Sequence, residues 1–378
     1  MLPTDLSLLS IILLAALIMV AIVQLVYHFK VFGRLLKKVG KSELPQKWQS
    51  VSVIVCAQSE YENLQKLVPA ILNQQYPDFE LVIVDDASWD HTTNYLEELQ
   101  LTEPRVKAVF VTEDMKKNSK GKKLALTLGV KAAKHEILLL TDADCMPNSE
   151  HWITEMVLPY HENPNTEIVL GYSPFIKRHA WTNLVAQMEN LLTAISYLGY
   201  AINSNPYMGV GRNLSYKKSL FFRVKGFASH HHIASGDDDL FVQDAANSTN
   251  TAICVNPKAF VNTTAKKTFK EWFQQKKRHN YVGKYYKKSH QFQLAFFAFI
   301  HALFWATMTV NIIFPETRWW SLIFLLVFWL IKIPFIFKVF KKLKRSNYAL
   351  WLPFFDVFYL FYNIVFGTIT LFGRQKKW

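Results

Sequence analysis

Two aspartates, Asp142 and Asp144, end a short apolar run, and their type and spacing suit a site for a metal-held phosphate. The run reads EILLLTDAD over residues 136–144, with one small residue between the carboxylates. Mg²⁺ typically takes one or two carboxylates plus substrate phosphate oxygens. Ligands of open α/β sheets lie beyond the carboxyl ends of buried parallel strands, which read as continuous hydrophobic runs. The pair therefore predicts a site for a divalent cation and a phosphate, with a solvated strand end as the alternative.

The elements that would position these carboxylates alternate between strand and helix patterns. Helix patterns near 60–74, 91–100 and 120–134 follow strand patterns at 51–57, 79–86 and 105–112. This alternation predicts right-handed crossovers and a mostly parallel sheet, whose strands deliver their last residues to one edge. Besides the aspartate pair, the residues expected at that edge are Ala57, Glu60, Asp85 and Asp86. Neither a GxGxxG after the first strand nor a Walker lysine loop occurs, so a dinucleotide fingerprint or a P-loop is not supported.

Apolar segments at both ends of the chain predict a membrane protein. Residues 6–27 carry no charge, and a bilayer core needs only about 20 apolar residues. Basic residues follow this segment instead of preceding it, which argues against a cleaved signal peptide and places the next domain in the cytoplasm; they are Lys30, Arg34, Lys37, Lys38 and Lys41. Further apolar segments cover 291–314, 319–340 and 348–373. We expect a multi-pass protein of the cell membrane, a bacterial inner membrane, with a cytoplasmic globular domain.

The stretches between the C-terminal apolar segments indicate their orientation. Residues 315–320 (PETRWW) are expected to form an extracytoplasmic loop with an aromatic belt, and residues 341–347 (KKLKRSN) a cytoplasmic one. Three complete crossings would export the basic C-terminal tail. The last segment, which contains Pro353 and Asp356, is therefore alternatively re-entrant or interfacial. Asp356 and Lys332 are either functional groups or polar contacts between packed helices.

The net charge of +14 favours anionic partners. Basic clusters beside the apolar segments account for part of it, since they attract anionic lipid headgroups. The remainder suits an anionic substrate. No signature of a nucleic-acid-binding module appears, so nucleic acid is not an expected partner. The sequence gives no indication of a protein partner.

Seven short stretches carry a resemblance to a known family. In chain order they are VSVIVCAQSEYENL (51–64), VDDASWDHT (84–92), SKGKKLAL (119–126), TDADC (141–145), GVGRNLSY (209–216), GDDDL (236–240) and QKKRH (275–279). The ordered set resembles glycosyltransferase family 2, membrane-bound enzymes with a GT-A fold. The resemblance implies an α/β, Rossmann-like domain with a mixed, mostly parallel sheet. N-terminal and C-terminal transmembrane helices and an interfacial amphipathic helix would flank this domain.

The resemblance also implies roles for the residues at the predicted sheet edge. Those that would bind the nucleotide sugar are Ala57, Glu60, Asp85, Asp86, Lys122 and Asp142, with Asp86 near the base. Asp144, with Asp142, would hold the Mg²⁺ or Mn²⁺ that bridges the diphosphate. The cation would then stabilise the negative charge that develops on the departing nucleoside diphosphate.

A second group of carboxylates lies in GDDDL. The family usually has Glu-Asp-x-Asp-Leu here, and this alignment puts Asp237 at the catalytic base position. Neighbouring carboxylates repel one another, which can raise a pKa toward the range of a useful base. Gly236 replaces the usual glutamate, so Asp238 is kept as an alternative base. The triplet alone would favour an acidic helix N-terminus over a catalytic base.

Residues 268–288 combine aromatic and basic side chains, which is typical of a helix in the membrane interface. The family carries Gln-x-x-Arg-Trp on such a helix, and Gln275 and Arg278 match its first and fourth positions. Arg278 would contact the diphosphate as a fixed cation. His279 replaces the Trp, which puts processive synthesis in doubt. Asn213 is a further candidate contact to donor or acceptor.

These features together predict an inverting glycosyltransferase. It would transfer a sugar from a nucleotide sugar, by resemblance a UDP-sugar, to a membrane lipid or a polyprenyl carrier. A processive polysaccharide synthase is one alternative, and a membrane-tethered module that binds nucleotide sugars without transferring them is another. The predicted domains are an N-terminal transmembrane helix (1–30), a cytoplasmic GT-A domain (48–265), an interfacial helix (266–290) and C-terminal transmembrane segments (291–373).

Overall fold

The fold consists of two units, which the computed structural model describes over residues 6–37, 45–117 and 121–372. One unit is Val39–Val282, and the other joins Met1–Lys38 to Gly283–Trp378. Lys38, Lys41 and the basic C-terminal tail, which entered the prediction of orientation, lie outside the described residues.

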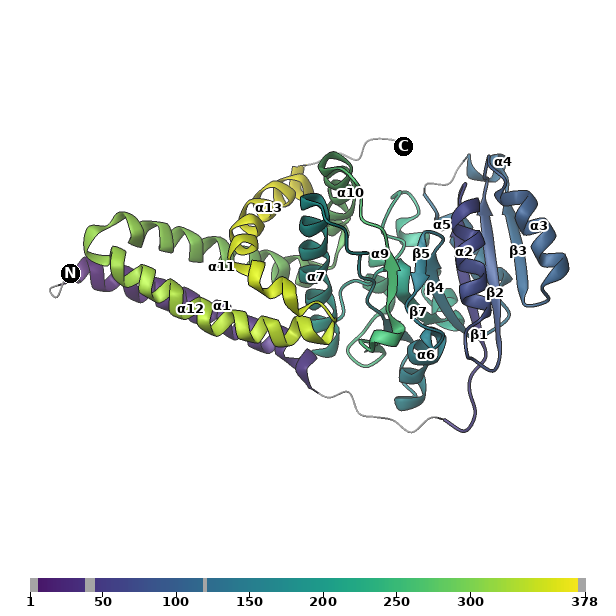
Figure 1. Ribbon diagram of the computed structural model, residues 1–378, viewed down its shortest axis with the longest axis horizontal. Helices are drawn as coiled ribbons and strands as arrows, with labels where there is room; N and C mark the ends of the chain where they lie inside the picture. Colours follow the sequence, from purple (N-terminus) through teal and green to yellow (C-terminus); the bar gives the residue numbers. More distant parts are fainter. Residues whose placement is uncertain (1–5, 38–44, 118–120, 373–378) are drawn as a thin grey trace. The chain divides into compact units, whose positions relative to one another are not determined.

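The first unit contains a mixed, mostly parallel sheet of seven strands in the order β3-β2-β1-β4-β7-β6-β8 (Figure 1). Neighbouring strands among the first four are parallel, whereas β7 is antiparallel to β4 and β6. The strands are β1 (Val51–Ala57), β2 (Phe79–Asp86), β3 (Val106–Val111), β4 (Ile137–Asp142), β6 (Ile168–Leu170), β7 (Leu214–Lys217) and β8 (Thr251–Ile253). A small antiparallel sheet pairs β5 (Cys145–Pro147) with β9 (Val261–Thr263). The predicted α/β class with a mostly parallel sheet is confirmed.

Helices follow the strands as the sequence pattern predicted. The α-helices of this unit are α2 (Tyr61–Leu72), α3 (Thr92–Thr102), α4 (Glu113–Lys116), α5 (Lys123–Ala132), α6 (Trp152–Glu162), α7 (Trp181–Ile202), α8 (Lys218–Arg223), α9 (Asp239–Ala245) and α10 (Phe269–Val282). Short 3₁₀ turns are η2 (Gly211–Asn213), η3 (Ala228–His230) and η4 (Pro257–Ala259).

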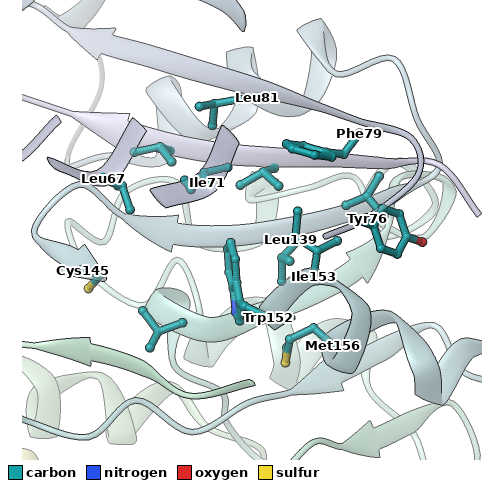
Figure 2. Packing of buried hydrophobic residues seen from close by; sticks show 14 of the residues in the cluster. Leu67, Ile71, Tyr76, Phe79, Leu81, Leu139, Cys145, Trp152, Ile153 and Met156 are labelled. Carbon is teal, nitrogen blue, oxygen red and sulfur yellow. The ribbon is translucent and has the colours of Figure 1, made fainter. Parts of the chain in front are cut away.

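The two faces of the sheet have separate cores, because successive side chains of a strand point to opposite faces. Val53 and Val55 of β1 belong to the core that α2 and α6 cover, where Trp152 is fully buried (Figure 2). On the other face, α5 packs closely because Gly129 has no Cβ. A Cβ at Gly129 would lie 2.9 Å from the side chain of Ile54. This close packing holds the second half of α5 against β1 and β2.

Among its described residues, the second unit contains four helices that are long and apolar enough to cross a membrane. They are Leu8–Leu36, Lys288–Ile313, Pro315–Lys342 and Ser346–Phe372. Within them the α-helices are α1 (Leu8–Phe32), α11 (Lys288–Ile313), α12 (Pro315–Lys342) and α13 (Leu352–Phe372), with 3₁₀ turns η1 (Gly33–Leu36), η5 (Gly283–Tyr285) and η6 (Ser346–Trp351). Over the described residues, each of the four predicted apolar segments is therefore mostly helical.

The loop expected at residues 315–320 is not a loop, and this prediction was wrong. Pro315 is the first residue of α12, so PETRWW forms the first turns of that helix. Proline favours this position because its fixed φ suits a helix and its missing N–H would have no partner there. Arg318 donates from Nε to the carbonyl of Ile312 (2.9 Å), which satisfies a carbonyl at the end of α11. The connection between the two helices is thereby reduced to Phe314.

Three buried polar side chains connect the C-terminal helices of this unit. Lys332 of α12 donates to Asp356 Oδ1 of α13 (2.7 Å), and His301 Nε2 of α11 lies 3.5 Å from the same oxygen. All three residues are at most 8% exposed. Asp356 therefore has a partner on each of the two neighbouring helices.

Replacing Lys332 with methionine should lower the free energy of unfolding by about 3 kcal/mol, because it leaves the buried Asp356 charge without its cation. The double variant Lys332→Met, Asp356→Leu removes both charges and should recover most of that loss. Thermal unfolding in detergent measures both, with Lys338→Met, an exposed lysine of the same helix, as the matched control. A double variant no more stable than the single one would contradict the ion-pair explanation.

Candidate active site

The carboxyl ends of three adjacent strands bring the predicted nucleotide-binding residues to one edge of the sheet. In the register of β1, Ala57 lies opposite Asp85 of β2, and Cys56 lies opposite Asp142 of β4. Asp86 is the last residue of β2. Burial raises the pKa of the Cys56 thiol to about 12, so Cys56 is a neutral group in the floor of this edge.

Lys122 connects the aspartate of β4 with the candidate base. Its ammonium donates to Asp142 Oδ1 (2.5 Å) and lies 3.5 Å from Asp237 Oδ2. Burial would raise the pKa of Asp142, but the Lys122 ammonium outweighs this and holds it below its usual value. A small pocket beside this lysine is lined by Cys56, Thr141 and Gly211, among others. Asp142 and Asp237, which are 95 residues apart in the sequence, thus both lie near the ammonium of Lys122.

Asp142 and Asp144 are placed to hold a divalent cation. One ligand atom each from Asp142, Asp144 and Cys145 lies within 4.8 Å of the other two. Burial raises the pKa of Cys145 well above its usual value, so its sulfur stays a protonated thiol. Asp144 is exposed and Asp142 is partly buried. Two such carboxylates fit a hard cation such as Mg²⁺ or Mn²⁺, whereas the neutral thiol of Cys145 does not. Glu60 lies within electrostatic range of both aspartates.

Asp237 and Asp238 have different surroundings. Asp238 caps α9, and its carboxylate accepts from the backbone N–H of Asp239 and of Gly211, both at 2.8 Å. Burial, and then the charge of Asp237, raise the pKa of Asp238. Both oxygens of Asp238 are therefore occupied, whereas the contact of Asp237 is with Lys122. This arrangement favours Asp237 over Asp238 as the group that can take a proton from a substrate.

The backbone explains why Gly236 stands where the family has a glutamate. Its φ is +80°, a region that residues with a Cβ rarely adopt. A Cβ at this position would also lie 2.8 Å from Val282 Cγ1. The turn before Asp237 therefore requires glycine in this chain. This backbone requirement explains why the glutamate of the family is absent here.

Lys123 is a site residue that the sequence reasoning missed, although it stands next to Lys122. Its buried ammonium donates to the carbonyls of His230 (2.7 Å) and Ile233 (2.8 Å). These residues belong to the loop that leads to Asp237. Lys123 thus holds the loop of the candidate base against the start of α5. A pair of adjacent lysines at a helix start was the only available sequence signal.

Lys123 also predicts a pH dependence of stability. Burial lowers the pKa of Lys123 from 10.5 to about 8. Between these values the unfolded chain binds more protons than the folded one, so the contribution of Lys123 to the free energy of unfolding rises with pH and is lowest below about pH 8. The difference in melting temperature between the wild type and Lys123→Met should therefore grow between about pH 8 and about pH 10. The exposed Lys131→Met is the control, and its difference in melting temperature from the wild type should not change over this pH range. If the difference for Lys123→Met were equally constant, this explanation would be contradicted.

The two loops that follow β1 and β2 form a rigid rim. Ser59 and Ala87 have φ of 56° and 54°, which is unusual for residues with a side chain. The loops are joined by a hydrogen bond from the backbone N–H of Ser59 to Ser88 Oγ (2.8 Å). Strained backbone of this kind persists only where surrounding contacts enforce it. The rim therefore has a fixed shape beside Asp86.

Asp86 and Asp85 differ, and the prediction for Asp85 is not supported. Asp86 lies 3.5 Å from the ammonium of Lys116, a residue that the sequence reasoning did not single out. Asp85 is buried and accepts from Ser88 N (3.0 Å) and Thr93 Oγ1 (2.6 Å). Its carboxylate is thus used to hold the loop after β2 and is not directed to a ligand.

Asn213 also departs from the prediction, because it is a core residue. It is fully buried, and its Oδ1 accepts from Trp152 Nε1 at 3.0 Å. Its Nδ2 donates to the carbonyls of Tyr172 (3.0 Å) and Ala259 (2.8 Å). With these bonds made, no side-chain donor is left for a substrate. Asn213 connects η2 to α6 and η4.

Helix α10 brings Arg278 to the site. Arg278 lies within electrostatic range of Asp237, Asp238 and Asp142. Gln275 is one turn earlier on the same helix and is partly buried. Not every basic residue of α10 faces outward, since Lys276 forms a buried ion pair with Glu189 of α7. This ion pair fixes the rotation of α10 that brings Arg278 near the carboxylates.

Comparison with known proteins agrees with this geometry. Residues 52–229 match the sequence model of glycosyl transferase family 2. A poly-beta-1,6-N-acetyl-D-glucosamine synthase of Staphylococcus epidermidis is 26% identical over 229 residues, 60% of this chain and 51% of that protein. A 4,4'-diaponeurosporenoate glycosyltransferase of Staphylococcus haemolyticus is 30% identical over 148 residues, 39% of this chain and 38% of that protein. The chain thus spans about half or less of these relatives.

The fold has a counterpart among solved structures. The mannosyltransferase PcManGT from Pyrobaculum calidifontis, solved with GDP-Man and Mn²⁺, aligns over 97% of this chain and 99% of its own, with a TM-score of 0.59 and 17% identity. The globular unit is a glycosyltransferase domain of the GT-A type. The match over residues 52–229 shows that this part of the chain is a glycosyltransferase family 2 domain.

Proposed function

We propose that this protein is an inverting, metal-dependent glycosyltransferase that transfers a sugar from a nucleotide sugar, most simply a UDP-sugar, to a membrane lipid or a polyprenyl carrier. The observation that carries this proposal is the position of Lys122 between Asp142 and Asp237. Asp142, a candidate ligand of the cation, and Asp237, the candidate base, thus both lie within 4.0 Å of the same ammonium.

In the proposed reaction, the acceptor hydroxyl attacks the anomeric carbon on the face opposite the leaving group. Asp237 takes the hydroxyl proton, the new C–O bond forms, and the bond to the nucleoside diphosphate breaks with its electron pair leaving on the diphosphate. Configuration is therefore inverted in one displacement. Lys122 and Arg278, which lie near these carboxylates, would stabilise the charge of the departing diphosphate.

Asp142 and Asp144 would hold Mg²⁺ or Mn²⁺, which supplies Lewis-acid stabilisation of the leaving group when bound. The presence of Mn²⁺ in PcManGT supports this assignment. Ala57, Glu60 and Asp86, with the rigid rim after β1 and β2, would form the nucleoside pocket. Gln275, on α10, would lie near Arg278 and the donor.

The acceptor side of the proposal rests on the membrane segments. Four helices are long and apolar enough to span a bilayer, and basic residues that follow the first of them favour a cytoplasmic catalytic domain. The predicted boundaries at 1–30, 48–265, 266–290 and 291–373 remain predictions, as does a re-entrant course for the last segment. Helix α10, with its basic and aromatic residues, is proposed to lie in the membrane interface.

The decisive experiment is a donor screen with purified protein in nanodiscs that contain native membrane lipids. UDP-sugars and GDP-mannose are supplied with Mn²⁺, and both released nucleotide and labelled lipid are measured. We expect one UDP-sugar to give lipid product, and EDTA to abolish it. Nucleotide-sugar binding without hydrolysis or transfer, in the presence of these lipids, would favour a binding module instead.

A processive polysaccharide synthase is the second candidate, favoured by the similarity to the poly-beta-1,6-N-acetyl-D-glucosamine synthase. The residue that follows Arg278 is His279, where the family has Trp, which argues for single transfer. Product length decides between the two: single transfer gives a lipid with one added sugar at all donor concentrations, whereas a synthase gives a polymer.

A further inference from the structure

Arg212 is a basic residue of the site to which neither the sequence motifs nor the proposed mechanism gives a role. It lies in η2, between two anchored neighbours. Gly211 donates its backbone N–H to Asp238 Oδ2 (2.8 Å), and Asn213 is fixed by three side-chain hydrogen bonds. The backbone of Arg212 therefore cannot move without disturbing both the core and the cap of α9.

The guanidinium of Arg212 is oriented but not paired. Its Cζ lies 5.3 Å from the centre of the Phe175 ring, and its Nε is buried with no hydrogen-bond partner. Within the described residues it takes part in no ion pair of 4.0 Å or less. An unsatisfied buried donor on a charged group is costly, so such a group is normally matched by an ordered water, an ion or a ligand. Arg212 thus has the properties of a preorganised anion contact.

Arg212 lies near both the carboxylates at the end of β4 and the loop of the candidate base. It lies within electrostatic range of Asp142 and Cys145, and its backbone neighbour Gly211 bonds to Asp238. The diphosphate of the proposed donor already has Lys122, Arg278 and the divalent cation. The bond from Gly211 to Asp238 places the backbone of Arg212 next to the loop of the candidate base, to which the acceptor hydroxyl must come. A planar guanidinium fork matches a carboxylate or a phosphate.

We propose that Arg212 binds an acidic group of the acceptor, a phosphate or a carboxylate, and thereby positions the acceptor hydroxyl at Asp237. The inference rests on the proposed glycosyltransferase function and specifies its substrate class as an acidic membrane lipid that also bears a hydroxyl. The charge of the chain agrees, since a protein of net charge +14 gathers anionic lipids near its surface.

The test uses three hydroxyl-bearing acceptors in neutral phosphatidylcholine nanodiscs, with full-length protein and the best donor from the screen. Diacylglycerol is neutral, phosphatidylglycerol carries a phosphate, and 12-hydroxystearate carries a carboxylate. We expect the wild type to prefer one of the two acidic lipids over diacylglycerol by at least about 10-fold in kcat/KM, and the preferred one identifies the acidic group.

Arg212→Gln should raise the KM for that acidic acceptor by about 10-fold or more while leaving the donor KM and the rate of donor hydrolysis unchanged. Arg212→Lys should restore part of the affinity, because it keeps the charge but not the fork. Arg178→Gln, an exposed arginine of the same unit, is the matched control.

Three results would overturn the inference. The first is equal use of diacylglycerol by the wild type, and the second is transfer to none of the three lipids while donor hydrolysis persists. The third is a raised donor KM in Arg212→Gln, which would assign Arg212 to the diphosphate. A wild type that neither hydrolyses nor transfers any donor would instead contradict the proposed function itself.

Discussion

Asp237→Asn should reduce sugar transfer by about 100-fold to 10,000-fold while leaving the affinity for the donor nearly unchanged, because a general base contributes a factor of this size. The amide is nearly isosteric with the carboxylate and keeps an oxygen toward Lys122, so the loop should hold its shape. Transfer is measured with labelled donor, and donor affinity by calorimetric titration of the nucleoside diphosphate in the presence of Mn²⁺.

Two further variants make this result specific. Asp238→Asn keeps an oxygen for only one of the two backbone N–H groups, those of Gly211 and Asp239, that Asp238 accepts from, but should still lose much less transfer than Asp237→Asn. Asp114→Asn changes an aspartate side chain that is 84% exposed and should behave as the wild type. If Asp238→Asn were the inactive variant and Asp237→Asn the active one, the base would have to be reassigned to Asp238.

Asp144→Asn should remove the dependence of donor binding on the metal. An amide oxygen is a weaker ligand for a hard cation than a carboxylate, and the site has only Asp142 and Asp144 as charged donors among the described residues. We expect Mn²⁺ to increase donor affinity by at least about 100-fold in the wild type, which corresponds to several kcal/mol of charge stabilisation, and to have little effect in the variant.

The metal-binding step can be followed without turnover. Mn²⁺ binding is measured by electron paramagnetic resonance in the presence of nucleoside diphosphate, with Asp114→Asn again as the control. Donor binding is measured in parallel with Mn²⁺ and with EDTA. A variant Asp144→Asn that binds Mn²⁺ and donor as tightly as the wild type would show that the cation, if used, is held elsewhere.

The strand ends could be predicted from the sequence because their pattern is local. Alternating strand and helix patterns require parallel strands whose carboxyl ends meet, so Ala57, Asp86 and Asp142 reach one edge as expected. The role of Asp85 could not be predicted in this way. Its carboxylate accepts from Ser88 and Thr93 of the loop and helix that follow β2, and a strand pattern does not report such side-chain contacts.

The remaining errors involve contacts between distant parts of the chain. Asn213 is held by groups 41 to 61 residues away, and no periodicity in the sequence reports such bonds. The contacts of Lys123 and Arg212 could not be predicted for the same reason. Lys123 bonds to the loop that contains His230, and Arg212 lies over the ring of Phe175. Gly236 shows the opposite case, in which a departure from the family pattern marks a backbone requirement.

The ion pair between Lys332 and Asp356 has a consequence for biogenesis. Each of these side chains alone would cost several kcal/mol in the hydrocarbon interior, whereas together they neutralise one another. We therefore expect α12 to remain in the protein-conducting channel during synthesis until α13 has emerged, so that the two helices are released laterally into lipid as a hairpin. The order of translation, and not hydrophobicity alone, would then determine when this part of the chain becomes embedded.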